Sequence, residues 1–415
     1  MNNLDTIRYL NKLYKSNFKK NNNCTKEVIV SLSEKNFLKN LVKNNTEKYI
    51  FLQKHSGPYC RKLEKEVSLS KDEISSIYKK NVKKGIRKID IDTFSSVYFT
   101  WIKYNNLTDE MHHRFNRAVL IPIHKKDDID NPKNYRYLYN FSNIIKLLDK
   151  IWANNICQEL TGKLDGDKYL SYHIRGEFNE NMKTKASKFT NSLDNKIMLD
   201  FEKAFDNVSF FSIKHLLKDF LIRKLGIDKG IKYFKQYFNI ITNSSIYFNK
   251  IKIKRNKGIP TGLPSSNLIF TAIINQIFYV YTKYFPDFLK YFNYNVYVDD
   301  IAIDILNNKI NIKKYLDPLL SIFKYYKFKC NFNKCLISKN ISFNYPKFNK
   351  ITTNTKYLGI YFSRDISEYF KLIIDEFNKK NKLECKNVYE MMKKKRKSSI
   401  GFLLFKLEPF KLSKI

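Results

Sequence analysis

Two adjacent acidic residues interrupt an apolar stretch in the second half of the chain. The segment FNYNVYVDDIAIDI, residues 292–305, places Asp299 and Asp300 between two runs rich in β-branched and aromatic residues. Such runs are typical of half-buried β-strands. A buried carboxylate costs several kcal/mol unless a partner or a metal ion compensates it. The segment therefore predicts a β-hairpin, whose acidic tip is either a chemical site or an ordinary exposed turn.

A third acidic residue favours the chemical site. Asp200 ends the apolar segment NKIMLD, which predicts another strand. If this strand pairs with the hairpin, Asp200 and Asp299 meet on one face of the sheet, where carboxylates repel and raise each other's pKa. A divalent cation removes that repulsion, and Mg²⁺ prefers one or two carboxylates together with substrate phosphates. Two such ions can align an attacking hydroxyl and stabilise the oxygens of a leaving pyrophosphate.

The charge of the chain favours a polyanionic partner. Its 415 residues carry a formal net charge of +38, and 43% of them are hydrophobic, which is typical of a globular protein. The excess is almost entirely Lys and accompanies abundant Asn, Ile, Phe and Tyr, as an AT-rich genome would also encode. The charge is therefore consistent with nucleic acid binding but does not establish it.

Other sequence features restrict the class of protein. No apolar run approaches the roughly 20 residues of a membrane helix, and the first residues lack the apolar core of a secretory signal. We therefore expect a soluble, intracellular protein without a membrane partner, in the nucleus, the cytoplasm or an organelle. The six cysteines have no disulfide rhythm, and the pair in CNFNKC has no second ligand pair for zinc, so we expect reduced, mostly buried thiols.

The periodicity of the chain predicts a mixed fold. Residues 117–126 indicate a strand, and 134–160 a turn followed by a helix. From 196 to 363 the expected order is β-α-α-β-β-α-β, with helices near 210–226, 258–285 and 311–327, and a last strand at 355–363. This order predicts an α+β layer with an antiparallel sheet and helices on one face.

Six segments in order resemble the motifs of reverse transcriptases. They are VLIPIHKKDDIDNPKNYR, LDFEKAFD, KGIPTGLPSSNLIF, YVDD, NFNKC and KYLGIYF. The pattern is most similar to non-LTR retrotransposon enzymes. The resemblance implies a right-hand fold, with fingers at 106–195, a palm at 196–363 (and a fingers part near 207–257) and a short basic thumb-like segment at 364–415. Residues 1–105 would form a basic helical extension.

The resemblance also implies the catalytic residues. Asp200 and Asp299 would bind two Mg²⁺ ions, with Mn²⁺ as an alternative, and Asp300 would assist. Lys334, in NFNKC, would protonate the leaving pyrophosphate as a general acid.

Six further residues would bind the incoming deoxynucleoside triphosphate. Lys125 and Arg136 would hold the phosphates, and Phe205 would exclude a ribose 2′-hydroxyl. Phe201, Thr261 and Gly262 would complete the pocket, although Thr261 stands where the family usually has Gln. Without the resemblance, Lys125 would be a solvated surface charge, Phe205 a core residue and the glycine segment an ordinary loop before a helix.

The sequence therefore predicts an RNA-directed DNA polymerase that binds an RNA template, a DNA or RNA primer and deoxynucleoside triphosphates. A stand-alone bacterial defence enzyme or an organellar intron-encoded enzyme of the same family is one alternative. A palm that has lost catalysis and only binds RNA is another.

Overall fold

The computed structural model describes residues 70–386, apart from 82–88, 126–127, 132–133, 162–188, 191, 250, 254, 308–309, 342–347, 364, 382–383. The chain forms two compact units that alternate along the sequence. The first unit comprises Met1–Leu170, Glu202–Pro286 and Lys314–Lys329, and the second comprises the remaining segments. Most of the expected N-terminal extension and most of the thumb-like segment lie outside the described residues, so the domain boundaries remain predictions.

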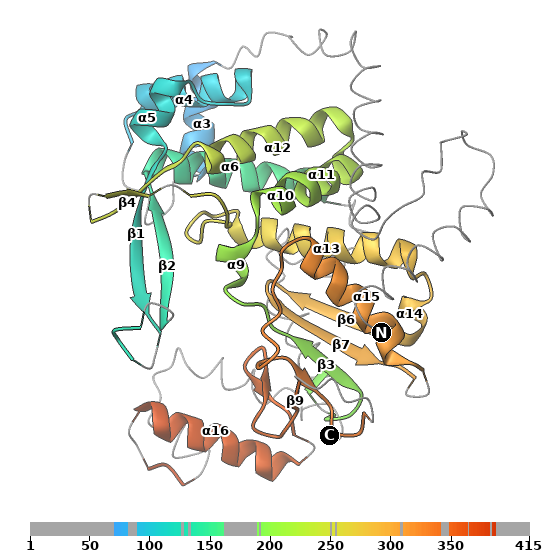
Figure 1. Ribbon diagram of the computed structural model, residues 1–415. Helices are drawn as coiled ribbons and strands as arrows, with labels where there is room; N and C mark the ends of the chain where they lie inside the picture. The colour runs from blue at the N-terminus through green and yellow to red at the C-terminus, as the bar shows by residue number, and fades with distance from the viewer. Residues whose placement is uncertain are drawn as a thin grey trace, which may run out of the picture. The chain divides into compact units, whose positions relative to one another are not determined.

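The first unit combines helices with a four-stranded sheet (Figure 1). The sheet has the order β2-β1-β4-β5, with strands β1 (Arg117–His124), β2 (Tyr135–Phe141), β4 (Ser245–Phe248) and β5 (Ile251–Ile253). Its helices are α3 (Lys71–Asn81), α4 (Ile91–Tyr104), α5 (Asp109–Phe115), α6 (Asn143–Leu160), α9 (Ala204–Asn207), α10 (Phe210–Ser212), η3 (Ile213–Leu217), α11 (Lys218–Leu225), α12 (Ile227–Thr242), α13 (Ser266–Tyr284) and most of α15 (Ile312–Tyr325).

Local sequence signals explain several of these helix boundaries. Asp90 and Ser142 cap α4 and α6 through side-chain oxygens that accept backbone N–H groups. Gly226 ends α11 with a φ of 84°, a backbone conformation that favours glycine. Residues 268–278 of α13 are buried without interruption, which is why this apolar helix forms the core of the unit.

The β1–β2 hairpin differs from the sequence prediction. Residues 135–141 form a strand that pairs antiparallel with β1, with Ile123 opposite Arg136, whereas the sequence predicted a turn leading into a helix. Alternating side chains in YRYLYNF fit a two-sided strand, but the apolar helix that follows obscured this short pattern. The helix itself begins at Asn143.

The second unit carries a five-stranded sheet of order β6-β7-β3-β8-β9. Its strands are β3 (Lys196–Leu199), β6 (Phe292–Tyr297), β7 (Asp300–Ile305), β8 (Leu336–Ile337) and β9 (Asn349–Lys350). All neighbours are antiparallel except β8 and β9. The same unit contains α14 (Phe288–Tyr291), β10 (Lys356–Tyr357), β11 (Ile360–Tyr361) and α16 (Ile366–Asn381).

The expected strand at 355–363 is instead a small hairpin. Leu358 and Gly359 have φ values of 50° and 83° between β10 and β11, so the chain reverses there. Tyr357, Ile360 and Phe362 remain buried in the core of the second unit. The hydrophobic alternation was therefore correct for burial but not for a continuous strand.

The structure confirms the predicted mixture of helices and strands in an α+β protein. The expected reduced thiols are also present, because Cys330, Cys335 and Cys385 are buried and free, and Cys157 is free and half-buried. Among the described residues, no helix is long and apolar enough to cross a membrane.

A buried carboxylate holds the start of α13. Asp149, which is 1% exposed, accepts hydrogen bonds from the backbone N–H and the hydroxyl of Ser265, at 2.8 and 2.6 Å. Burial raises the pKa of Asp149 to about 7, although both bonds from Ser265 lower it. The interaction joins α6 to the residue that precedes α13.

We expect this carboxyl group to make stability depend on pH. Its folded pKa lies above the unfolded value of 3.8, so between about pH 4 and 7 the folded state binds a proton that the unfolded state has released. Stability should therefore fall as pH rises through this range, by up to about 1.4 kcal/mol per pH unit. Asp149→Asn keeps one acceptor oxygen for the Ser265 N–H, and its NH2 group can donate to the Ser265 hydroxyl oxygen. The variant should remove this pH dependence, which urea unfolding at pH 5 and 7.5 would measure. A native chain and an Asn variant with parallel pH profiles would contradict the assignment.

Candidate active site

Asp299 and Asp300 lie at the tip of the β6–β7 hairpin, as the sequence predicted. Tyr297 pairs with Asp300, which leaves Val298 and Asp299 as a two-residue turn. Val298 is 7% exposed and has a φ of 55°. A β-branched residue rarely adopts a positive φ, and such strain accumulates at functional sites. The turn therefore holds Asp299 in an exposed position through a strained, buried neighbour.

The strand that ends in Asp200 pairs with this hairpin. Leu199 lies opposite Ile301 in the antiparallel register, so one more residue along each strand brings Asp200 beside Asp300. From the sequence we expect Asp200 and Asp299 to meet on one face of the sheet, and this stays a prediction. Asp300 is exposed as a residue, but desolvation of its carboxyl group, together with the charges of Asp299 and Asp200, raises its pKa to about 6. The negative charges of Asp299 and Asp200 thus both act on Asp300.

The turn at residues 330–335 holds the backbone of Asp200. The Asp200 carbonyl accepts the N–H of Asn331 at 2.8 Å, and the Asp200 N–H donates to the Cys335 sulfur at 3.4 Å. Burial raises the pKa of the Cys335 thiol to about 11, and raises that of Cys330 further. These cysteines are therefore neutral thiols that support Asp200. Lys334 lies in the same turn and is exposed.

The acidic cluster has suitable chemistry for Mg²⁺ but does not form a closed metal cage. Among the described residues, no three His, Cys, Asp or Glu side chains are arranged to hold a metal ion. Carboxylate oxygens are hard ligands, and Mg²⁺ in nucleotide-using sites needs only one or two of them besides substrate phosphates. Burial and, after it, the charges of Asp299 and Asp200 raise the pKa of Asp300, and a cation would relieve the repulsion among these charges. The donor set therefore fits the ion.

The glycine-containing loop predicted to contact the nucleotide belongs to the first unit. It is hydrogen-bonded on one side to the α9 region, because Ile259 N–H donates to the Phe205 carbonyl at 2.8 Å. On the other side the loop is hydrogen-bonded to β2. The Tyr139 N–H donates to the Thr261 carbonyl at 2.8 Å, and the Thr261 hydroxyl donates to the Tyr137 carbonyl at 2.5 Å. Gly262 has a φ of 120°. The Thr261 hydroxyl thus anchors the loop.

A group of cations surrounds Asp206 in the same unit. Burial raises the pKa of Asp206, while Lys203, Lys125, Lys257 and Arg136 lower it through their positive charges, in that order. The predicted phosphate ligands Lys125 and Arg136, from opposite sides of one hairpin, are therefore brought into electrostatic reach of the loop region. Both are exposed. Asp206 provides the negative charge near these cations.

The two predicted aromatic residues are placed differently. Phe205 is half-buried and stacks on Phe270, with ring centroids 4.7 Å apart. Phe201 is 6% exposed, and its backbone pairs with that of Cys330. Phe201 therefore packs in the interior of the second unit, and Phe205 retains exposed surface in the first.

The structure thus gathers the predicted residues into two groups. Asp200, Asp299, Asp300, Phe201 and Lys334 belong to the second unit, and the other five belong to the first. Sequence reasoning assigned no role to Asp206, although it is the last letter of LDFEKAFD. The available signal was that this motif ends in a second Asp, six residues after Asp200.

Comparison with known proteins identifies the family. Residues 123–362 match the model of the family described as Reverse transcriptase (RNA-dependent DNA polymerase), which is more than half of the chain. The chain belongs to the reverse transcriptase family. The description of the family names the activity of an RNA-dependent DNA polymerase.

One relative of this chain is a retroelement protein. The chain is similar to the "Retrovirus-related Pol polyprotein from type-1 retrotransposable element R2" of Popillia japonica, with 29% identity over 189 residues. The match covers 39% of this chain and 22% of the relative. The chain thus matches only a small part of that polyprotein.

Proposed function

We propose that the chain copies RNA into DNA by adding deoxynucleotides to a primer, as part of a retroelement. The observation that carries this proposal is the acidic hairpin tip, where Asp299 and Asp200 lie close enough to Asp300 for their charges to act on its carboxyl group. The strained Val298 turn presents the tip to solvent. An exposed surface turn without chemistry would need neither feature.

The residues of the second unit would perform the transfer. Asp200 and Asp299 would hold two Mg²⁺ ions, assisted by Asp300. The ions would stabilise the attacking oxygen and the charge on the leaving pyrophosphate. Lys334, on the turn that holds Asp200, would donate a proton to the pyrophosphate. The bonds from Asn331 and Cys335 would keep the Asp200 backbone fixed during the reaction.

The residues of the first unit would bind the nucleotide. Lys125 and Arg136 would contact the triphosphate, and Arg136 offers a planar fork of donors that suits phosphate oxygens. The exposed edge of Phe205 would screen the sugar, with Phe270 fixing the ring from behind. Thr261 and Gly262 would line the base. Phe201, in the interior of the second unit, would support the neighbouring Asp200.

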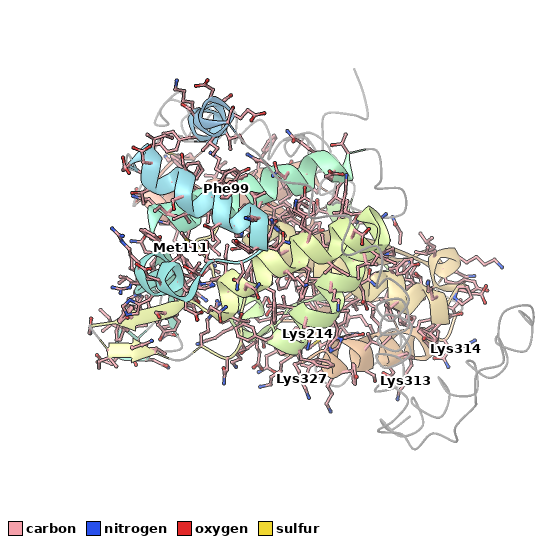
Figure 2. The ribbon with its side chains drawn as sticks, turned by 90° about the horizontal axis from the view of Figure 1, so that it is seen from above. Phe99, Met111, Lys214, Lys313, Lys314 and Lys327 are labelled. Carbon is pink, nitrogen blue, oxygen red and sulfur yellow. The ribbon has the colours of Figure 1, made fainter. Side chains whose placement is uncertain are left out.

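Nucleic acid would be the main macromolecular partner. The first unit carries exposed lysines, among them Lys214 and Lys327, which are labelled in Figure 2. A phosphate backbone releases counterions when such lysines neutralise it. An RNA template with a DNA or RNA primer is therefore the expected ligand, and its binding should weaken steeply with salt.

Primer extension tests the proposal directly. We expect the native chain to extend a DNA primer annealed to an RNA template with deoxynucleoside triphosphates in Mg²⁺, and to use ribonucleoside triphosphates far less well. Omission of the divalent cation should abolish the reaction. A chain that binds the template–primer but stays inactive in Mg²⁺, in Mn²⁺ and with protein-primed substrates would favour the alternative of an RNA-binding palm without catalysis.

A further inference from the structure

A partly enclosed arginine connects the segments that form the nucleotide half of the site. Arg255 lies between β5 and the glycine-containing loop, and is half-buried. Its guanidinium donates to the carbonyl of Ile241, in the last turn of α12, at 2.6 Å. It also donates to the carbonyl of Gly258 at 3.4 Å. One side chain therefore bridges the end of a helix and the first residue of the loop.

Aromatic rings complete the surroundings of this guanidinium. Its central carbon lies 5.6 Å from the ring centroid of Tyr139 and 5.4 Å from that of Phe210. Tyr139 is the β2 residue whose N–H binds the Thr261 carbonyl. Phe210 begins α10, shortly after Phe205 and Asp206. Arg255 thus contacts both structures between which the loop is held.

The position of Arg255 is unfavourable for a residue with no more than a packing role. Its Nε atom is enclosed and has no hydrogen-bond partner among the described residues. Enclosing a charge costs free energy unless hydrogen bonds and opposite charges compensate it. Burial lowers the pKa of Arg255, and Tyr237, Tyr139 and Asp206 lie within electrostatic reach and partly oppose this. A planar fork can bridge two carbonyls while it stacks on rings, and a lysine cannot.

We propose that Arg255 is a positioning residue for the incoming nucleotide, which acts by fixing the Gly258–Gly262 loop between β2 and the Phe205–Asp206 segment. The proposal rests on the proposed polymerase function. Arg255 would not itself touch the substrate. It would set the loop position, and thereby the affinity for the deoxynucleotide, without changing the chemical step or the affinity for the template–primer.

Steady-state kinetics of Arg255 variants test this role. We expect Arg255→Met to raise KM for the deoxynucleotide about tenfold or more, because a loop displaced by about 1 Å loses contacts with the substrate. Arg255→Lys should give a smaller increase, since it keeps one donor and the charge. In both variants kcat and the dissociation constant of the template–primer should stay within about twofold.

Arg223 offers a matched control in the same unit. It is also half-buried, lies over the ring of Tyr279 at 4.0 Å and donates to the Gln276 side chain at 3.1 Å. Arg223→Met should lower the thermal midpoint without the selective rise in KM. If Arg255→Met changes KM no more than Arg223→Met does, Arg255 is only structural and the proposal is overturned.

Hydrogen exchange separates this proposal from the proposed function. In the nucleotide-free chain, Arg255→Met should accelerate exchange of the Ile259 and Tyr139 amides, which form the two loop attachments, while Arg223→Met should not. This result does not depend on activity. An inactive native chain would refute the polymerase function, whereas unchanged exchange in Arg255→Met would refute the positioning role.

Discussion

Replacement of Asp299 by Asn should reduce deoxynucleotide incorporation by about 10³-fold or more while the protein stays folded. Asp299 is exposed in a two-residue turn, so the substitution removes one charge without disturbing a packed core. The loss of a ligand carboxylate would remove several kcal/mol of transition-state stabilisation, and each 1.36 kcal/mol corresponds to tenfold in rate. Single-turnover primer extension at saturating nucleotide would measure the effect.

Asp287→Asn is the matched control for this prediction. Asp287 belongs to the same unit, and its side chain is 63% exposed, so its replacement should leave the rate within about twofold. The affinity for template–primer should not fall in either variant, since removing a negative charge does not weaken binding to a phosphate backbone. Similar rates for Asp299→Asn and the native chain would exclude Asp299 as a metal ligand.

The β6–β7 hairpin was predictable because residues that are adjacent in the sequence determine it. Apolar alternation on both sides of Asp299 and Asp300 specifies two strands, and the acidic pair can only lie at their junction. The position of Asp200 beside Asp300 was not predictable in the same way. The register of β3 against β7 depends on which faces of the two strands are buried together. No local sequence pattern predicts which residue of β7 lies opposite a given residue of β3.

The residues that support the glycine-containing loop were less accessible to sequence reasoning. Arg255 lies 14 residues after Ile241 and 116 residues after Tyr139 in the sequence, so its contacts come from tertiary packing alone. Asp206 belongs to a motif that the sequence analysis quoted, but the positive charges that surround it come from four cations in three separate segments. The strand β2 was missed because seven residues of moderate alternation precede a strongly apolar helix.

Gly262 should be the least replaceable residue of the loop. A Cβ atom at this position would lie 2.5 Å from the Tyr139 carbonyl oxygen and 3.2 Å from the Leu138 side chain. The first contact is with backbone and cannot be relieved by a side-chain rotation. The φ of 120° adds backbone strain for any residue with a side chain. Gly262→Ala should therefore push the loop away from β2 and break the bond between Tyr139 and Thr261.

We expect Gly262→Ala to lower kcat/KM for the deoxynucleotide by about 10²-fold, the effect of misplacing substrate contacts by about 1 Å. Gly226→Ala is the matched control, because Gly226 has a φ of 84° but nothing within 4 Å of its added Cβ. Both variants carry the strain of a positive φ, roughly 1–2 kcal/mol, and should lose similar stability from that source. Only Gly262→Ala meets the backbone of β2. Equal losses of kcat/KM in the two variants would show that close packing of the loop against β2 does not govern nucleotide use.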